Sequence, residues 1–458
     1  MTTPAHTEKP LFKKILIANR GEIALRILRA CREMGIKTVA VHSTADSDSM
    51  HVRLADESVC IGSAPSKNSY LNMAALISAA EVTGAEAIHP GVGFLSENEK
   101  FAAMVEEHKM TFIGPTPHHI AIMGDKISAK NTMIALGVPV VPGSAGSVST
   151  DEEALSAAKA IGYPILIKAT SGGGGKGMKV AHNDDELLAN VRLAKIEAKA
   201  NFGNDEVYME RYLGAPRHIE VQIICDTHGN VVHLGERDCS IQRRHQKVWE
   251  EAPSPGLTQK DRERLGDIVT QAMQKMGYRG VGTLEFLFEK GEFFFMEMNT
   301  RIQVEHPITE MVTGVDLVRE QIRVAAGHKL SFTQEDINIK GHAIECRINA
   351  EDAVTFIPSP GKVTGYHAPG GIGIRVDSHL YHGYTVPPHY DSLVSKLIVF
   401  GDTREECLTR VERALFEYAI DGISTTIPLH QRLAKEKDIQ SGDYTIHWLE
   451  KKLKENEA

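Results

Sequence analysis

The first quarter of the chain alternates short apolar runs with stretches of helical periodicity, and this alternation constrains the fold more than any other feature. Lys14–Ala18 predicts a buried strand, and Thr38–Val41 predicts the next one. Between them, apolar side chains recur at helical spacing, at Ile23, Ile27, Cys31 and Met34. Because a strand–helix–strand unit of this kind connects parallel strands, the segment predicts an open parallel sheet flanked by helices.

A second unit of the same kind follows, with a strand, a helix and a strand over Ala87–His89, Glu97–His108 and Thr111–Ile113. The loops Asn19–Glu22 and His89–Gly93 come directly after predicted strands, so we expect them at the edge of the sheet where ligands bind. Ser96 stands where a dinucleotide fingerprint would carry its third glycine, and we therefore reject that motif. Ordinary turns at a sheet edge are an alternative interpretation of both loops.

Composition narrows the class of protein. The 458 residues are 42% hydrophobic and 24% charged, which excludes wholesale disorder and predicts two to four domains. The net charge of −9 argues against a protein that coats nucleic acid. No run of about 18 apolar residues offers a membrane span. The polar first residues predict no secretory signal, and six separated cysteines without CxxC spacing predict reduced thiols, a cytoplasmic location and no cysteine-cluster zinc site.

A glycine-rich segment, Thr170–Val180, is the strongest local motif. Consecutive glycines let backbone N–H groups approach phosphate oxygens without obstruction by side chains. The segment lies between two predicted strands, Ile165–Lys168 and Met178–Ala181, and fits no Walker A register, so it predicts a hairpin lid over phosphates. Lys168 before the loop and Lys126 further upstream are candidate phosphate ligands, although solvated surface lysines and a flexible linker are the alternatives.

The segment from Glu285 to Asn299 predicts an acidic β-hairpin. A three-residue loop over Lys290–Glu292 would place Glu285 opposite Glu297, with Asn299 on the same face. Facing carboxylates repel unless a cation lies between them, so this arrangement predicts a Mg²⁺ site. A two-residue turn would instead place Glu285 on the opposite face of a simple surface hairpin.

Three further segments carry candidate anion-binding groups. Arg301 and Glu305 follow the hairpin, and they suit a planar anion such as bicarbonate and a nearby base, with a surface ion pair as the alternative. Five basic side chains between Arg237 and Lys247 suggest a local anion site, without the interleaved aromatic residues of a nucleic-acid platform. The alternating strand His342–Asp352 places Glu345 and Arg347 on one face, where a buried structural ion pair is the alternative.

Together these segments resemble biotin carboxylase, the ATP-grasp enzyme of the biotin-dependent carboxylases. The motifs that carry the resemblance follow one another over nearly the whole chain: Ala18–Ala24, His89–Asn98, Met123–Lys126, the glycine-rich segment, Glu236–Lys247, Glu297–Pro307 and Glu345–Asp352.

The resemblance implies a mixed α/β and α+β fold in three parts. These are a Rossmann-like α/β domain over residues 1–125, an ATP-grasp domain over 126–336 and a C-terminal α+β domain over 337–458. A mobile glycine-rich lid is expected at residues 141–212 of the ATP-grasp domain.

The resemblance also implies residue roles. The implied ATP contacts are Lys126, Lys168, Gly174, Gly175, Glu210, Arg211, Tyr212, Leu213, His218, Gln242 and His245. The implied ligands of Mg²⁺ or Mn²⁺ are Glu285, Glu297 and Asn299. The implied bicarbonate pocket is Lys247, Arg301, Gln303 and Val304, with Glu305 as the base and Arg347 as the group that stabilises the biotin enolate.

The implied activity is ATP-dependent carboxylation of biotin through carboxyphosphate, as in the first half-reaction of acetyl-CoA carboxylase in fatty acid biosynthesis. The chain has no Met-Lys-Met biotinylation site, so we expect a biotin carboxyl carrier protein and carboxyltransferase subunits as partners, and a homodimer. Propionyl-CoA or pyruvate as final acceptor, another ATP-grasp ligase and a non-catalytic nucleotide-binding module are the alternatives. Two residues depart from what the resemblance implies: Val92 stands where an aromatic residue is expected near the biotin pocket, and Ile372 replaces a phenylalanine associated with one family member's subunit contact.

Overall fold

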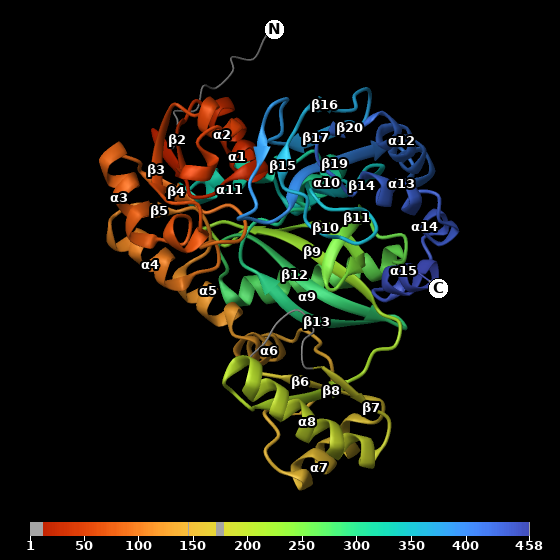
Figure 1. Ribbon diagram of the computed structural model, residues 1–458. Helices are drawn as coiled ribbons and strands as arrows, with labels where there is room; N and C mark the ends of the chain where they lie inside the picture. Colours follow the sequence, from red (N-terminus) through yellow and green to blue (C-terminus); the bar gives the residue numbers. More distant parts are fainter. Residues whose placement is uncertain (1–11, 145, 171–177, 458) are drawn as a thin grey trace.

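The computed structural model describes residues 12–144, 146–170 and 178–457, which form a large body and a smaller projecting unit (Figure 1). Gly174 and Gly175 of the predicted lid loop lie outside the described residues. The architecture is mixed α/β and α+β, as predicted. None of the described helices is long and apolar enough to cross a membrane. The six cysteines are free, and only Cys60 is exposed.

The N-terminal part is the parallel sheet predicted from the strand–helix alternation. Its strand order is β3-β2-β1-β4-β5, and every neighbouring pair is parallel. The strands are β1 (Lys14–Ile17), β2 (Lys37–Ser43), β3 (Glu57–Gly62), β4 (Ala87–His89) and β5 (Thr111–Phe112). The helices are α1 (Gly21–Glu33), α2 (Met50–Leu54), α3 (Met73–Thr83), α4 (Glu99–Glu107) and α5 (Pro117–Gly124).

The direction of strand progression in this sheet reverses between β1 and β4, where ligands of open α/β sheets commonly bind. The Asn19 side chain, just after β1, donates hydrogen bonds of 2.7 Å to the carbonyl oxygens of Pro90 and Val92, just after β4. The two predicted edge loops are therefore tied together.

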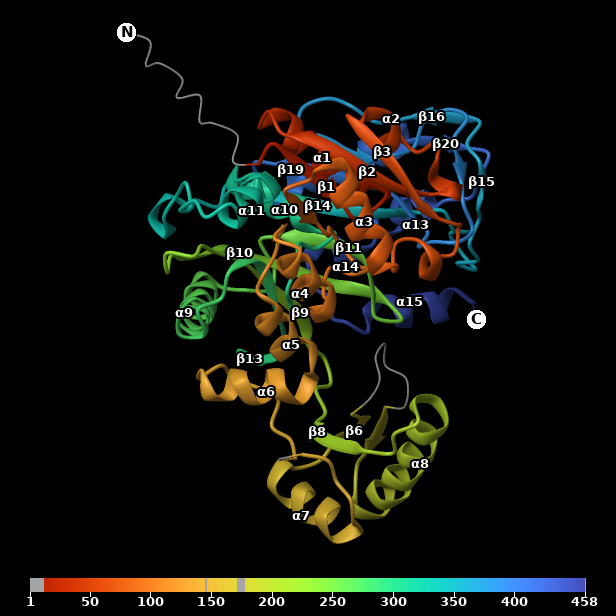
Figure 2. The same cartoon turned by 90° about the vertical axis from the view of Figure 1, so that its left-hand side faces the viewer.

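The projecting unit is a small sheet covered by two helices (Figures 1 and 2). Its antiparallel strands have the order β7-β6-β8, with β6 at Ile165–Ala169, β7 at Lys179–Ala181 and β8 at Val207–Arg211. Helices α7 (Asp151–Ile161) and α8 (Asp184–Phe202) bury its apolar side chains, and α6 (Lys126–Ala135) precedes the unit. A capping box between Thr150 and Glu153 starts α7.

The body contains an eight-stranded sheet of order β13-β12-β9-β10-β11-β14-β19-β17. Its strands are β9 (Arg217–Cys225), β10 (Val231–Arg243), β11 (Gln246–Ala252), β12 (Gly280–Glu289), β13 (Glu292–Asn299), β14 (His342–Asn349), β17 (Ile374–Ser378) and β19 (Leu393–Gly401). Helices α9 (Gln259–Met276), α10 (His306–Thr313) and α11 (Leu317–Ala325) lie between these strands in sequence. The sheet joins segments on both sides of residue 337, and the domain boundaries stay a prediction.

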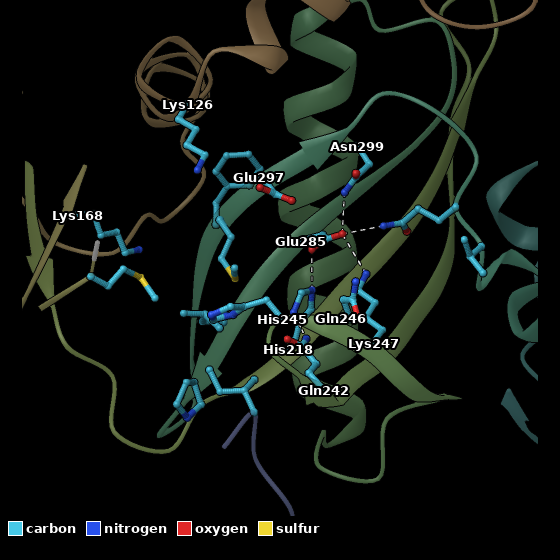
Figure 3. A pocket seen from close by; sticks show the side chains of 18 of the residues that line it. Lys126, Lys168, His218, Gln242, His245, Gln246, Lys247, Glu285, Glu297 and Asn299 are labelled. Atoms are coloured by element: carbon cyan, nitrogen blue, oxygen red, sulfur yellow. Dashed lines mark hydrogen bonds and ion pairs between the residues drawn. The ribbon is translucent and has the colours of Figure 1, made fainter. Parts of the chain in front are cut away.

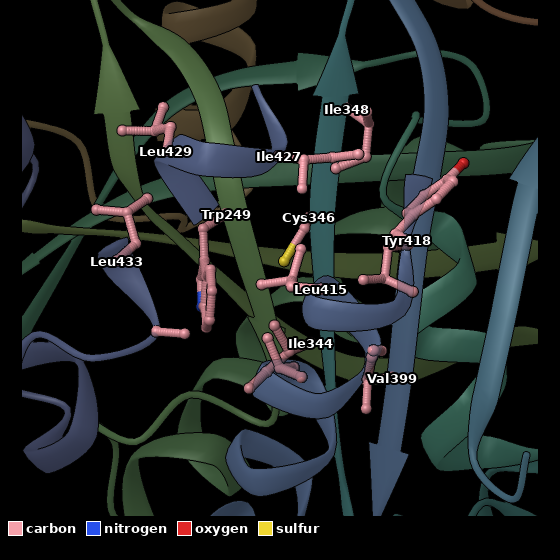
Figure 4. Packing of buried hydrophobic residues seen from close by; sticks show 14 of the residues in the cluster. Trp249, Ile344, Cys346, Ile348, Val399, Leu415, Tyr418, Ile427, Leu429 and Leu433 are labelled. Atoms are coloured by element: carbon pink, nitrogen blue, oxygen red, sulfur yellow. The ribbon is translucent and has the colours of Figure 1, made fainter. Parts of the chain in front are cut away.

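The C-terminal part adds α12 (Arg404–Glu417), α13 (Ile427–Leu433), α14 (Lys437–Ser441) and α15 (Trp448–Glu457). The short strands are β15 (Gly361–Lys362), β16 (Gly365–His367), β18 (Thr385–Val386) and β20 (Ala419–Asp421). Figure 4 shows Trp249 of β11 packed with Ile344 and Cys346 of β14 against side chains of α12 and α13. This core fixes β11 and β14, whose opposite faces carry charged residues.

Candidate active site

A cavity of about 1370 Å³ lies where the parallel sheet, the projecting unit and the large sheet meet. Figure 3 shows charged side chains pointing into it from several elements. The predicted site residues that the structure describes all line this cavity: Lys126, Lys168, Glu210, Arg211, Tyr212, Leu213, His218, Gln242, His245, Lys247, Glu285, Glu297, Asn299, Arg301, Gln303, Val304, Glu305 and Arg347.

The acidic hairpin has the predicted pairing but not the predicted loop. Glu289 pairs with Glu292, so the turn consists of Lys290 and Gly291 alone, with φ angles of 51° and 79°. The three-residue loop was therefore wrong. A regular ladder from this turn would pair Glu285 with Met296 and would send Glu297 to the other face.

A β-bulge restores the predicted juxtaposition. Phe286 pairs with Phe295 but Glu285 pairs with Glu297, so Met296 is an extra residue in β13. Met296 and Glu297 are both exposed to the cavity. The two carboxylates therefore come from facing positions, as the metal hypothesis requires.

The donor set of this hairpin fits a hard divalent cation. Burial and the negative charge of Glu285 raise the pKa of Glu297, a repulsion that a cation between them would relieve. Asn299 adjoins Glu285, with 2.7 Å from its Nδ2 to Glu285 Oε1. Two carboxylates and an amide oxygen are oxygen ligands of the kind that Mg²⁺ and Mn²⁺ accept.

The ammonium of Lys247 is the centre of charge in the cavity. It donates to Glu220, to Glu305 at 2.6 Å and to Glu285 at 3.1 Å. Burial lowers the pKa of Lys247, but the three carboxylates outweigh burial and raise it well above its usual value. Lys247 is therefore a fixed positive charge, suited to holding a small anion.

Two groups of side chains resemble metal ligand sets by proximity alone: His218, Glu220 and Glu285, and Glu220, Cys239 and Glu305. The carboxylates of both groups contact the Lys247 ammonium, and neither group includes Glu297 or Asn299 of the acidic hairpin. Burial also raises the pKa of the Cys239 thiol well above its usual value, so a thiolate ligand is disfavoured. We assign neither group to a metal.

Glu305 links Lys247 to Arg347. It lies at the N-cap position of α10, and Arg347 Nη2 donates to its Oε2 at 2.9 Å. Burial raises the pKa of Glu305, but Lys247, Arg347 and Arg237 outweigh burial and lower it well below its usual range. The carboxylate is therefore ionised and able to accept a proton.

The expected alternative of a Glu345–Arg347 ion pair is wrong. Arg347 Nε donates to Glu250 Oε1 at 2.5 Å, and both carboxylate oxygens of Glu345 lack a hydrogen-bond partner within the described chain. Glu250 of β11 is the register partner of Glu345 of β14, and Glu250 rather than Glu345 accepts the hydrogen bond of the guanidinium.

Lys168 of the projecting unit and Lys130 of α6 converge on one carboxylate. Glu210 Oε2 accepts from Lys168 at 2.6 Å, and its Oε1 accepts from Lys130 at 3.0 Å. In Figure 3 Lys126 lies beside Glu297, with Lys168 across the cavity. Three positive charges thus surround the space in front of the acidic hairpin, as phosphate binding requires.

Arg301 does not form the i, i+4 ion pair with Glu305 that was the alternative interpretation. Its Nε donates to Glu97 at 2.9 Å, and its Nη2 donates to the Asn299 side chain at 2.8 Å. The guanidinium therefore lies beside the acidic hairpin, close to the predicted metal ligands.

The basic segment from Arg237 to Lys247 is only partly an anion site. Arg237 is fully buried and its five N–H groups donate to Glu220, Gln222, Thr283, Gln303 and Thr309. The prediction was wrong for Arg237, which holds Gln303 and Glu220 in place. Arg243 stacks on Phe356, 3.7 Å from the ring centroid, and His245 and Lys247 line the cavity.

Comparison with known families accounts for nearly the whole chain. Residues 11–120 match the model "Biotin carboxylase, N-terminal domain", and residues 345–451 match "Biotin carboxylase C-terminal domain". Residues 125–333 match "Carbamoyl-phosphate synthase L chain, ATP binding domain". A curated biotin carboxylase from Haemophilus influenzae is 62% identical over 98% of this chain and 100% of its own length.

The chain belongs to the biotin carboxylase family. It is thus an ATP-dependent enzyme that carboxylates biotin. A pyruvate carboxylase subunit from Methanothermobacter thermautotrophicus is 53% identical, over 96% of this chain and 90% of that protein.

Solved biotin carboxylases have the same fold. A biotin carboxylase–beta-gamma-ATP complex from Campylobacter jejuni has a TM-score of 0.91 and 48% identity, covering 97% of this chain and 99% of that one. The biotin carboxylase domain dimer of 2-oxoglutarate carboxylase from Hydrogenobacter thermophilus, with MgADP, ADP and bicarbonate, has a TM-score of 0.90 and 51% identity, covering 96% and 97%.

Sequence reasoning missed four residues of the biotin carboxylase cavity or its supports: Lys130, Glu220, Glu250 and Tyr390. Lys130 follows Lys126 by one helical turn, and Glu220 follows His218 by one strand repeat, so spacing could have indicated both. Glu250 and Tyr390 have no such local signal. Tyr390 stacks on Arg20 at 4.1 Å and lines the cavity with Val92.

Proposed function

We propose that this biotin carboxylase acts on biotin borne by a separate carrier protein and activates bicarbonate as carboxyphosphate at the expense of ATP. The observation that carries this proposal is the position of Glu305, shared at hydrogen-bond distance by Lys247 and Arg347. The Glu305 carboxylate thereby contacts both Lys247, the proposed bicarbonate ligand, and Arg347, the proposed ligand of the biotin oxyanion.

The nucleotide would lie between the projecting unit and the acidic hairpin. Lys126, Lys168 and the Glu210 segment supply one wall, and His218, Gln242 and His245 supply the other. The phosphates would draw Lys168 and Lys130 from Glu210, since a triphosphate offers more negative charge than one carboxylate. Gly174 and Gly175 are proposed as lid contacts with the phosphates.

Glu285, Glu297 and Asn299 would hold Mg²⁺ or Mn²⁺, consistent with the MgADP in the Hydrogenobacter thermophilus structure. When bound, the ion would neutralise charge on the phosphates. Magnesium is thus proposed as the resident cation of this chain.

Bicarbonate would lie between Lys247, Arg301, Gln303 and the backbone at Val304. Glu305 would take the bicarbonate proton as its oxygen attacks the γ-phosphorus, giving carboxyphosphate and ADP. Lys396, whose Nζ donates to the Val304 carbonyl at 2.8 Å, holds this backbone in place. Positioning and electrostatics therefore supply the catalysis.

Carboxyphosphate would release CO₂ beside biotin, and the departing phosphate would take the ureido proton. Arg347 would stabilise the oxyanion that develops on biotin. Val92 and Tyr390 both line the cavity, so its wall includes an aromatic ring although position 92 carries none.

Acetyl-CoA is proposed as the final acceptor, with propionyl-CoA or pyruvate as the alternatives, since relatives include both biotin carboxylases and a pyruvate carboxylase subunit. A biotin carboxyl carrier protein and carboxyltransferase subunits are the proposed partners. The cytoplasmic location stays a prediction.

The test is ATP hydrolysis by the purified chain with Mg²⁺, with and without bicarbonate and free biotin. We expect hydrolysis that requires bicarbonate and rises with biotin, together with carboxybiotin formation from labelled bicarbonate. ATP hydrolysis without bicarbonate dependence would favour another ATP-grasp ligase, and its complete absence would favour a nucleotide-binding module.

A further inference from the structure

Two fully buried glutamates lie side by side behind Arg347. Glu250 of β11 and Glu345 of β14 are register partners in the large sheet, and each is 0% exposed. Directly opposed residues of antiparallel strands point to the same side of the sheet. Arg347 follows Glu345 by two residues on β14, so it shares this face.

The hydrogen bonds of the two carboxyl groups are unequal. Glu250 Oε1 accepts from Arg347 Nε at 2.5 Å. Glu250 Oε2 and both oxygens of Glu345 have no partner within the described residues. An ionised carboxylate without donors is costly to bury, whereas a carboxylic acid can donate its proton to a neighbouring carboxylate.

The surrounding cations do not neutralise Glu345. Lys396 is the register partner of Arg347, and its Nζ is engaged by the Val304 carbonyl and by Glu22 at 3.1 Å. Burial raises the pKa of Glu345 well above its usual value, against the attraction of Lys396 and Arg347. Burial likewise raises the pKa of Glu250 to about 7, against Arg347. The charged groups that act on the pair are Arg347, Glu305, Lys247 and Lys396.

We propose that Glu250 and Glu345 form a proton-sharing pair that positions Arg347, with Glu345 as the protonated member and Glu250 as the anion that anchors the guanidinium. The proton stays on the pair, and no group is transferred. The inference rests on the proposed function, in which Arg347 contacts biotin. Because Glu250 holds Nε, the Nη groups of Arg347 remain directed to the cavity, where Nη2 now contacts Glu305. When these groups turn to biotin, Glu305 would be free to act as a base.

The pair predicts a separation between the two partial reactions. Protonation of Glu250 in the acidic range removes the anchor, so biotin carboxylation falls as the pH decreases through about 7. Bicarbonate-dependent ATP hydrolysis does not need Arg347 in place, so it persists further into the acidic range. A merely structural role of Glu250 would slow both reactions together.

The experiment compares wild type, Glu250→Gln and Glu345→Gln in the full chain. For Glu250→Gln we expect kcat of biotin carboxylation to fall on the order of 10- to 100-fold because Arg347 is misplaced. Its bicarbonate-dependent ATP hydrolysis should stay within about threefold of wild type. Its biotin carboxylation should no longer show the fall in rate below about pH 7, which we call the acid limb of the pH profile. For Glu345→Gln, which mimics a neutral acid, we expect the acid limb of wild type to be kept.

An infrared spectrum gives a readout that does not depend on activity. Wild type at neutral pH should show the C=O stretch of a buried carboxylic acid, and Glu345→Gln should lack that band. Absence of the band in wild type, a lost acid limb in Glu345→Gln, or equal slowing of both reactions in Glu250→Gln would overturn the inference. Wild type without bicarbonate-dependent ATP hydrolysis would instead refute the proposed function, while the infrared band still tests the pair. If Glu250→Gln does not fold, the pH profile of Glu345→Gln and the infrared band of wild type still test the inference.

Discussion

Single side chains in the cavity are held by opposite charges rather than by solvent. Lys247 has three carboxylate partners, and Glu210 has two lysine partners. Removing one member of such a buried group leaves an uncompensated charge, which costs more than the pair contributes. Substitutions that test function are therefore best made at groups that face the cavity.

Glu297→Gln removes one of the two opposed carboxylates. We expect turnover of Mg-ATP to fall at least about 100-fold, because a cation ligand at the phosphates contributes several kcal/mol. The free energy of unfolding should change by no more than about 0.5 kcal/mol, because Glu297 faces the cavity and not the core. Steady-state ATP hydrolysis at ordinary Mg²⁺ and thermal unfolding measure the two effects. Glu292→Gln, on the exposed end of the same strand, is the control, and near-normal turnover of Glu297→Gln would refute the assignment.

Arg347→Ala is expected to slow biotin carboxylation far more than bicarbonate-dependent ATP cleavage. It also leaves Glu250 and Glu305 without their guanidinium, so stability should fall by about 3–5 kcal/mol. Both reactions are measured at a temperature where the variant is folded. Arg347→Lys keeps the positive charge but loses the planar guanidinium with its several N–H donors. It therefore separates the effect on biotin carboxylation from the effect on stability. An equal loss of both reactions in Arg347→Ala would show that Arg347 serves structure or nucleotide binding.

At the scale of elements, β-bulges in β13 and β11 determine which charged side chains point into the cavity. Met296 is the extra residue in β13, and Val248 is an extra residue in β11, between the pairs Gln242–Lys247 and Ile241–Trp249. A bulge turns the strand by one position, so Lys247 faces the cavity while Trp249 packs in the core. Both bulges lie next to the candidate site. Because of its bulge, β11 contributes one side chain to the hydrophobic core and another to the cavity.

Glu251 joins β11 to β14, to α12 and to Tyr444. It accepts from His342 at 2.6 Å, from Arg404 at 2.7 Å and from the Tyr444 hydroxyl. Burial raises the pKa of Glu251, but the hydrogen bonds and charges of His342 and Arg404 outweigh burial and lower it to about 2. The folded state therefore binds fewer protons than the unfolded state between the ordinary pKa and about 2, so this stabilisation is present above about pH 4 and is lost as the pH falls.

We therefore expect Glu251→Gln to lower the melting temperature at neutral pH, with a loss of about 3 kcal/mol. The difference from wild type should narrow as the pH is lowered from about 5 to 3, because wild type loses the same contribution. Thermal unfolding across this range measures both chains, with Glu263→Gln on the exposed face of α9 as the control. A difference that does not change with pH would contradict the assignment.

At the scale of the whole molecule, the cavity exists only because three parts meet around it. The loops after β1 and β4, the projecting unit and the large sheet each supply one wall. Figures 1 and 2 show how these three parts are arranged. Three of the four described lysines that line the cavity lie on α6 or the projecting unit, whereas the proposed metal ligands Glu285, Glu297 and Asn299 lie on the large sheet. A polyanion bound together with a cation would therefore contact both walls.

Ile372, 85% exposed, lies on the loop before β17, at the position where the sequence predicted a departure from one family member's subunit contact. Because an apolar side chain this exposed gains most from burial by a second copy, we expect Ile372→Asp to weaken a homodimer and yield more monomer. Sedimentation velocity over a concentration series measures the change. Ile196→Asp, exposed on α8 of the projecting unit, is the control. Unchanged dimer content in Ile372→Asp would exclude this loop from the interface.

The sequence by itself determined what depends on neighbours along the chain: the parallel sheet, the hairpins and the motifs of the biotin carboxylase family. Periodicity identified β1, α1 and β4, because burial of one face repeats at fixed spacing. The tertiary structure alone decided the bulges at Met296 and Val248, the partner of Arg347, the burial of Arg237 and the pairing of Glu250 with Glu345. These depend on strand register and on contacts between residues far apart in sequence, where the cost of burying each charge selects its partner.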